Sequence, residues 1–134
     1  MSDLDWVTAR HQCSLDSIFN QLATQVQADV ETRKALSSGT PLRCDVENHV
    51  ISVILEGIPG MADSVHFCKT ESGIEVWDKN RKHMFVGTPT LNDEGECRLK
   101  VKGEEKELWQ FRKMALEDLF FTPLKGRLAR ITGS

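Results

Sequence analysis

The chain has 134 residues, of which 40% are hydrophobic and 28% are charged, and its formal net charge at pH 7 is −3. A chain of this length can bury its own core, so we expect one domain over residues 1–134, and the composition excludes wholesale disorder. The acidic balance argues against a protein dedicated to nucleic acid, because such proteins usually carry a basic surplus.

Hydropathy and the first residues bear on location. No apolar run approaches the roughly 18–20 residues that a membrane-spanning helix needs. Residues 1–6 are acidic, whereas a secretory leader begins basic and continues apolar. We therefore expect a cytoplasmic protein without membrane contact, and in a reducing compartment its cysteines should be free thiols. These cysteines are Cys13, Cys44, Cys68 and Cys97.

Two segments near the start of the chain have helical signals. Residues 2–13 are predicted to form a short helix or arm with Ser2 as its cap. Its expected apolar contacts are Leu4, Trp6 and Val7. A stronger helix is predicted over residues 14–37, with Ser14 as its cap and apolar residues at helical spacing. This stripe comprises Leu15, Ile18, Phe19, Leu22, Val26 and Val30.

Residues 42–102 alternate between short apolar runs and turn residues, a pattern typical of an antiparallel meander. The predicted strands cover residues 42–47, 50–56, 64–70, 74–78, 83–87 and 96–102. Because proline donates no backbone hydrogen bond, Pro89 predicts that the strand before it ends there or lies at an edge.

The third and fourth predicted strands form a hairpin that suggests a possible site. With a three-residue loop that ends at Gly73, Phe67 faces Trp77 across the strands. The same register places His66 opposite Asp78, a histidine–carboxylate dyad of the kind used in general base catalysis. An ordinary surface pair is the simpler explanation, because no serine elbow or oxyanion-hole motif accompanies the two residues.

Residues 104–121 are predicted to form the second long helix, with glutamates in its first turn. Its apolar stripe comprises Leu108, Phe111, Ala115 and Leu119, widened by Trp109, Leu116 and Phe120. Residues 122–134 form a basic tail, either a short amphipathic turn or a frayed end. The expected fold is α+β, a two-layer sandwich in which a five- to six-stranded antiparallel meander carries an N-terminal and a C-terminal helix on one face.

Cys13 is a candidate for chemistry because it immediately precedes a predicted helix. The helix dipole and free amides can activate a thiol at such a position, and His11 lies two residues away. The alternative is a small residue packed beneath the helix start. A zinc site from two His-x-Cys pairs, which would add His66 and Cys68, is disfavoured because zinc ligands usually follow closer Cys–Cys or His–His spacing. We expect neither a metal nor a cofactor.

Basic and aromatic residues are the candidates for a ligand or partner surface. They are Trp77, Lys79, Arg81, Lys82, Arg98, Lys100 and Lys102. With the basic tail, the cations could contact a polyanion or an acidic partner, but the acidic net charge favours an ordinary solvated surface. The number of large aromatic side chains favours a self-association surface or a cleft between sheet and helices.

Motifs for catalysis are absent from the sequence, which contains no P-loop, GxGxxG, HExxH or EF-hand pattern. The leading hypothesis is a non-enzymatic interaction domain that works as a homodimer or with a protein partner. The first alternative is a small-molecule binding or simple enzymatic cleft between sheet and helices. The second is nucleic-acid contact through the basic strand and tail.

Overall fold

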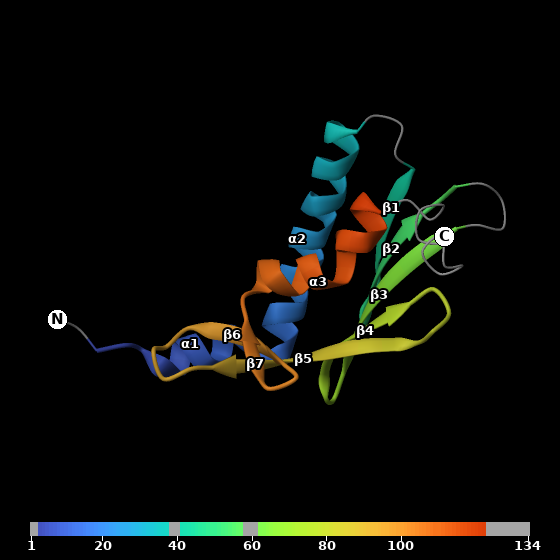
Figure 1. The fold of residues 1–134 in the computed structure, drawn as a ribbon. Helices are drawn as coiled ribbons and strands as arrows, with labels where there is room; N and C mark the ends of the chain where they lie inside the picture. Colours follow the sequence, from blue (N-terminus) through green and yellow to red (C-terminus); the bar gives the residue numbers. More distant parts are fainter. Residues whose placement is uncertain (1–2, 38–40, 58–61, 123–134) are drawn as a thin grey trace.

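The computed structural model describes residues 3–37, 41–57 and 62–122 and has an α+β architecture (Figure 1). In this part of the chain the helices are α1 (Trp6–Gln12), α2 (Leu15–Leu36) and α3 (Leu108–Phe121). The strands are β1 (Leu42–Val46), β2 (Val50–Leu55), β3 (Asp63–Thr70), β4 (Gly73–Asp78), β5 (His83–Leu91), β6 (Cys97–Val101) and β7 (Glu104–Lys106). All neighbours pair antiparallel in the order β1 to β7, so the predicted meander is confirmed but has seven strands among the described residues.

The long helix α2 follows the prediction closely. Ser14 is its cap, and its hydroxyl oxygen accepts a hydrogen bond from the Ser17 amide at 3.2 Å. Five residues of the expected stripe are buried, and Leu15 packs partly against them. The buried ones are Ile18, Phe19, Leu22, Val26 and Val30. The 3.6-residue period therefore identified the face that packs on the sheet.

The first helix is shorter than predicted and contributes less to the core. Asp5 caps α1 by accepting a hydrogen bond from the Thr8 amide at 3.1 Å, whereas Ser2 lies outside the described residues. No residue of α1 is buried, and Trp6 and Val7 are exposed, so the predicted apolar contacts are wrong for these two.

The start of the predicted C-terminal helix is also corrected. Lys102 and Gly103 both have positive φ (51° and 83°), as the tight turns of two-residue hairpins require. The turn folds Glu104–Lys106 back onto β6 as β7, where these residues pair with Leu99–Val101. Helix α3 begins only at Leu108, and the Glu107 amide donates to Gln110 Oε1 at 2.8 Å.

The register of the β3–β4 hairpin differs from the prediction by one residue. Gly73 is not in the loop but pairs with Thr70, so the turn between the strands has two residues. A Cβ at Gly73 would lie 2.4 Å from the Gly87 carbonyl oxygen on β5, so close approach between strands explains the glycine. Phe67 therefore faces Val76 and not Trp77, and both Phe67 and Val76 point into the core.

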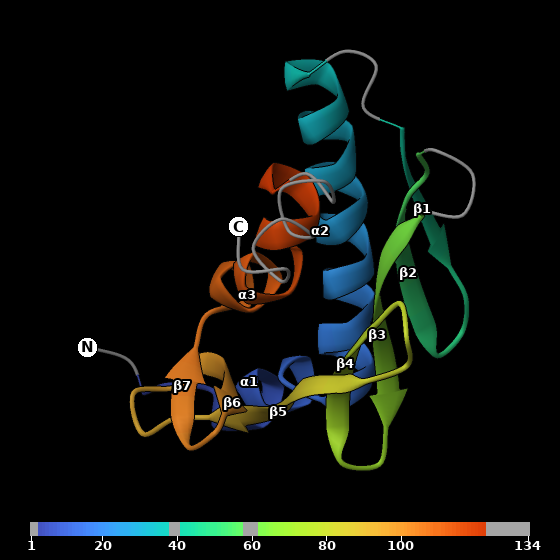
Figure 2. The ribbon, with the colours of Figure 1, turned by 45° about the vertical axis from the view of Figure 1, so that its right-hand side comes forward.

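Strand β5 continues through Pro89, where we expected an end or an edge. Its first half pairs with β4 up to Gly87, and its second half, from Thr88 to Leu91, pairs with β6. Among the described residues no strand pairs with the β4 side of β5 beyond Gly87, so a residue without an amide proton is tolerated there. The sheet bends along β5, and α2 and α3 lie in the angle between its two parts (Figure 2).

The core lies where the two long helices meet the concave side of this sheet. Phe111 of α3 is fully buried, and its ring centroid is 6.1 Å from that of Phe67 and 5.4 Å from that of Phe85. A Cβ at Gly87 would lie 2.5 Å from Phe111 Cε1, so the ring occupies the space that a side chain at position 87 would need.

Among the described residues, none of the helices combines the length and the apolar character that a membrane span requires.

A disulfide joins Cys13 to Cys97, so the expectation of four free thiols is wrong for these two residues. The Cα atoms are 5.5 Å apart, although the cysteines are separated by 84 positions in the sequence. The bond links the α1–α2 junction to the start of β6, and Cys13 is 1% exposed. Cys44 and Cys68 are free, and burial raises the pKa of the Cys44 thiol to about 11.

Counting thiols tests this assignment. Alkylation of the unfolded protein without reductant should modify two cysteines per chain, Cys44 and Cys68, and alkylation after reduction should modify all four, as measured by mass spectrometry. In a Cys13→Ala variant the count without reductant should rise to three, because Cys97 loses its partner. Four modified thiols in the unreduced wild type would contradict the disulfide.

Candidate partner-binding groove

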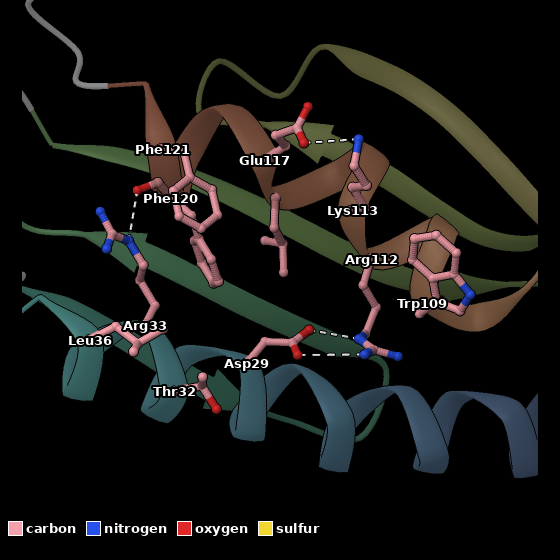
Figure 3. A pocket seen from close by; sticks show the side chains of 11 residues that line it. Asp29, Thr32, Arg33, Leu36, Trp109, Arg112, Lys113, Glu117, Phe120 and Phe121 are labelled. Carbon is pink, nitrogen blue, oxygen red and sulfur yellow. Dashed lines mark hydrogen bonds and ion pairs between the residues drawn. The ribbon is translucent and has the colours of Figure 1, made fainter.

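A groove of about 350 Å³ lies between the C-terminal half of α2 and helix α3 (Figure 3). We call it the α2/α3 groove. Its lining includes Asp29, Arg33, Leu36, Trp109, Arg112 and Phe121. The helices are brought together by their buried stripes, which both pack on the sheet, and their remaining faces leave the groove open.

The surface of this groove is mainly apolar. Leu116 forms part of the lining and is itself buried, which connects the groove to the core. Around it, three large apolar side chains are exposed: Leu36 by 76%, Phe121 by 62% and Trp109 by 52%. Water therefore contacts large hydrophobic side chains from two helices along the groove, which is costly unless something covers them.

An ion pair ties the two helices together at the groove. Arg112 Nε donates to Asp29 Oδ2 at 2.6 Å, and a second guanidinium nitrogen is 3.5 Å from Asp29 Oδ1. The same guanidinium donates to the Gln25 side-chain carbonyl. The side chains of Arg112 and Asp29 are only 18% and 30% exposed, so solvent screens this pair less than an ordinary surface pair.

Arg33 holds the C-terminal end of α3. Its Nε donates to the Phe120 carbonyl oxygen at 3.0 Å, in the last turn, where helical carbonyls lack partners within the helix. Its guanidinium carbon lies 4.7 Å from the centroid of the Phe121 ring, in a cation–π contact. The Phe121 ring is therefore exposed on one side and contacted by Arg33 on the other.

The predicted catalytic residues do not come together. Each ring nitrogen of His66 lies 2.9 Å from a serine hydroxyl oxygen, that of Ser64 on one side and that of Ser52 on the other. His66 faces Trp77 across the hairpin, because the true register moves each pair by one residue. Asp78 instead accepts hydrogen bonds from the backbone amides of the β4–β5 turn. The predicted His66–Asp78 dyad is wrong.

The surroundings of the other candidates do not support catalysis. Burial lowers the pKa of His66, and the cation of Arg81 adds to this, so the neutral ring is favoured. Cys13 is bonded to Cys97 and has no free thiol. Among the described residues no group of three or more metal-ligating side chains occurs that could hold a metal ion.

The predicted partner surface is split into separate groups. Lys79, Arg81 and Lys82 are exposed at the β4–β5 turn. Lys100 on β6 lies opposite Thr88 on β5. Thr88 is six residues beyond Lys82, which immediately precedes β5, so about 20 Å of strand separates Lys100 from the basic turn.

The remaining members of that surface are already engaged or lie apart. Arg98 pairs with Glu96 at 2.9 Å, and Lys102 lies in the β6–β7 turn. Trp77 is half-buried, and its ring meets that of His83 edge-on at 5.2 Å. The basic tail lies outside the described residues.

Sequence reasoning missed the groove, because it treated both helices only as core elements. Asp29 and Arg33 are one helical turn apart on α2, outside its apolar stripe. Trp109 is predicted to widen the buried stripe and Phe121 is expected only as one of several large aromatic side chains, whereas both are exposed. The available signal was that these two aromatics do not fall on the row of Phe111, Ala115 and Leu119.

No protein-family model matches the chain, and no significant match is found among curated proteins or solved structures.

The ion pair between Arg112 and Asp29 at the groove should contribute to the stability of the protein. Arg112→Met should lower the free energy of unfolding by about 1–3 kcal/mol, because Asp29 keeps its charge in a partly buried place without its donor. Denaturant unfolding measures the change. The control is Lys34→Met, which breaks an exposed pair with Glu31 (3.9 Å) and should change stability by less than about 0.5 kcal/mol. Equal effects of the two substitutions would contradict a special role for the Arg112 pair.

Proposed function

We propose that the protein is a non-enzymatic interaction domain whose α2/α3 groove receives an apolar segment of a protein partner, either a second copy of the chain or another protein. The carrying observation is the exposure of Trp109, Phe121 and Leu36 together at the groove. Aromatic side chains dominate the energetic centres of protein interfaces because they bury large area with few rotatable bonds.

The groove is prepared for binding by contacts within the chain. Arg33 stacks on Phe121, and Arg112 fixes the separation of α2 and α3 through Asp29. Anchors that are already held in place lose less conformational freedom on binding than mobile ones. A partner that covers them would gain apolar burial without reorganising either helix.

A small apolar molecule is the alternative occupant, since about 350 Å³ falls at the lower end of ligand-pocket volumes. An enzymatic role has less support, because the histidine and cysteine candidates lie outside the groove lining. Nucleic-acid contact is also weakly supported, since the basic residues of the sheet do not form one continuous surface among the described residues.

A cytoplasmic location belongs to the proposal as well. The observation that weighs against it is the Cys13–Cys97 disulfide, because structural disulfides are rare in reducing compartments. A thiol count on protein trapped in acid directly from cells decides between a reducing and an oxidising compartment. Four reduced thiols would agree with a cytoplasmic location, and two would agree with an oxidising compartment.

Site-specific photo-crosslinking in cells tests the proposed function. A benzoylphenylalanine at Thr32, an exposed residue of the groove lining, should give a discrete covalent adduct with another polypeptide. The same probe at Met84, an exposed residue on β5 away from the groove, should give none or a different one. The adduct mass separates a second copy from another protein. Absence of any intermolecular adduct specific to Thr32 would contradict the proposal.

A further inference from the structure

We infer that the occupant of the α2/α3 groove is helix α3 of a second copy, packed antiparallel across a two-fold axis. This inference rests on the proposed function and names its partner. It starts from four residues of α3, namely Trp109, Lys113, Glu117 and Phe121, which we call the α3 stripe.

The α3 stripe is a single exposed row. Its members are spaced four residues apart, so they lie above one another on one side of the helix. All four line the groove. Trp109 and Phe121 are 52% and 62% exposed, and the side chains of Lys113 and Glu117 are 57% and 54% exposed. The row thus presents a continuous surface to a neighbour over about 18 Å of helix.

The order of residue types in the α3 stripe is self-complementary. Along the helix it runs aromatic, cation, anion, aromatic, and its midpoint is at residue 115. When two copies pack antiparallel about that midpoint, Trp109 of one faces Phe121 of the other. Lys113 of each copy then faces Glu117 of the other. A two-fold contact uses each of these pairs twice, which is the form that isologous dimer interfaces take.

Within a single chain the charged members already pair, with Lys113 Nζ 2.9 Å from a Glu117 carboxylate oxygen. In the dimer each group keeps an opposite charge beside it, so burying the row leaves no charge unpaired. The exposed Leu36 at the end of α2 adds apolar surface beside Phe121, and Arg33 keeps the Phe121 ring in position.

Other occupants match the α3 stripe less well. A uniformly acidic helix would pair with Lys113 but oppose Glu117. Residues 123–134 of the chain itself carry Lys125, Arg127 and Arg130 and no acid, so they would bring cations against Lys113 and Arg33. Only a segment with both charges in the reversed order satisfies the row, and α3 of a second copy has that order.

A charge-exchange experiment tests the inference on the chain of residues 1–134. Sedimentation equilibrium over the micromolar range should show wild-type protein passing from the 15.1 kDa monomer to twice that mass. Lys113→Glu or Glu117→Lys alone should each raise the dissociation constant roughly tenfold, because like charges then face each other at two symmetric contacts. A one-to-one mixture of the two variants should associate again, because each heterodimer contact joins opposite charges.

Two controls distinguish an effect at the α3 stripe from a general effect of charge or folding. Lys34→Glu changes the charge of an exposed residue of α2 outside the groove lining and should leave self-association unchanged. Thermal unfolding by circular dichroism should be similar for both single variants, since each loses only an exposed pair within one helix.

The outcomes separate this inference from the proposed function. A wild type that stays monomeric, or a mixture that associates no better than its components, overturns the second copy as occupant. If the Thr32 crosslink then gives an adduct with another protein, the proposed function stands. An intrachain crosslink from Thr32 to residues 123–134, with no intermolecular adduct, overturns both and assigns the groove to the tail.

Discussion

The packing of Phe111 against Gly87 is the constraint on which the rest of the structure depends. The ring lies between Phe67 and Phe85, and it occupies the space where any larger residue at position 87 would place its Cβ. Because this contact fixes α3 on the sheet by one face, the opposite face of the helix is directed away from the core. That outer face carries the α3 stripe, so the groove is a consequence of how α3 is seated on β5.

The sequence was sufficient for features that depend on local periodicity. The stripe of α2, its Ser14 cap and most strands follow from patterns within twenty residues, and the structure confirms them. Features set by distant or subtle geometry were not predictable. Cys13 and Cys97 are 84 positions apart, and nothing local marks them as partners. The Lys102–Gly103 turn did carry a hairpin signal, but the glutamates that follow also suit the first turn of a helix, and the hairpin prevailed.

The candidate site was predicted least well because a binding groove depends on the relative placement of two helices. Arg112 and Asp29 are 83 positions apart, and their pairing becomes visible only once both helices are seated on the sheet. The predicted His66–Asp78 dyad is wrong for a local reason. A one-residue difference in the register of a hairpin moves every side chain of one strand relative to its neighbour on the other. His66 is held instead by two serine hydroxyls, a polar arrangement that orients the ring without a carboxylate.

The unfolding free energies of Gly87→Ala, Phe111→Leu and the double variant test the central contact most directly. If Phe111 occupies the space above Gly87, Gly87→Ala should lower the free energy of unfolding of the wild type by about 1–3 kcal/mol. The same substitution should cost clearly less in the Phe111→Leu background, because the ring atoms that contact position 87 are then absent. A strand alanine that stabilises the protein, or that costs the same in both backgrounds, would contradict the seating of α3 and the groove built on it.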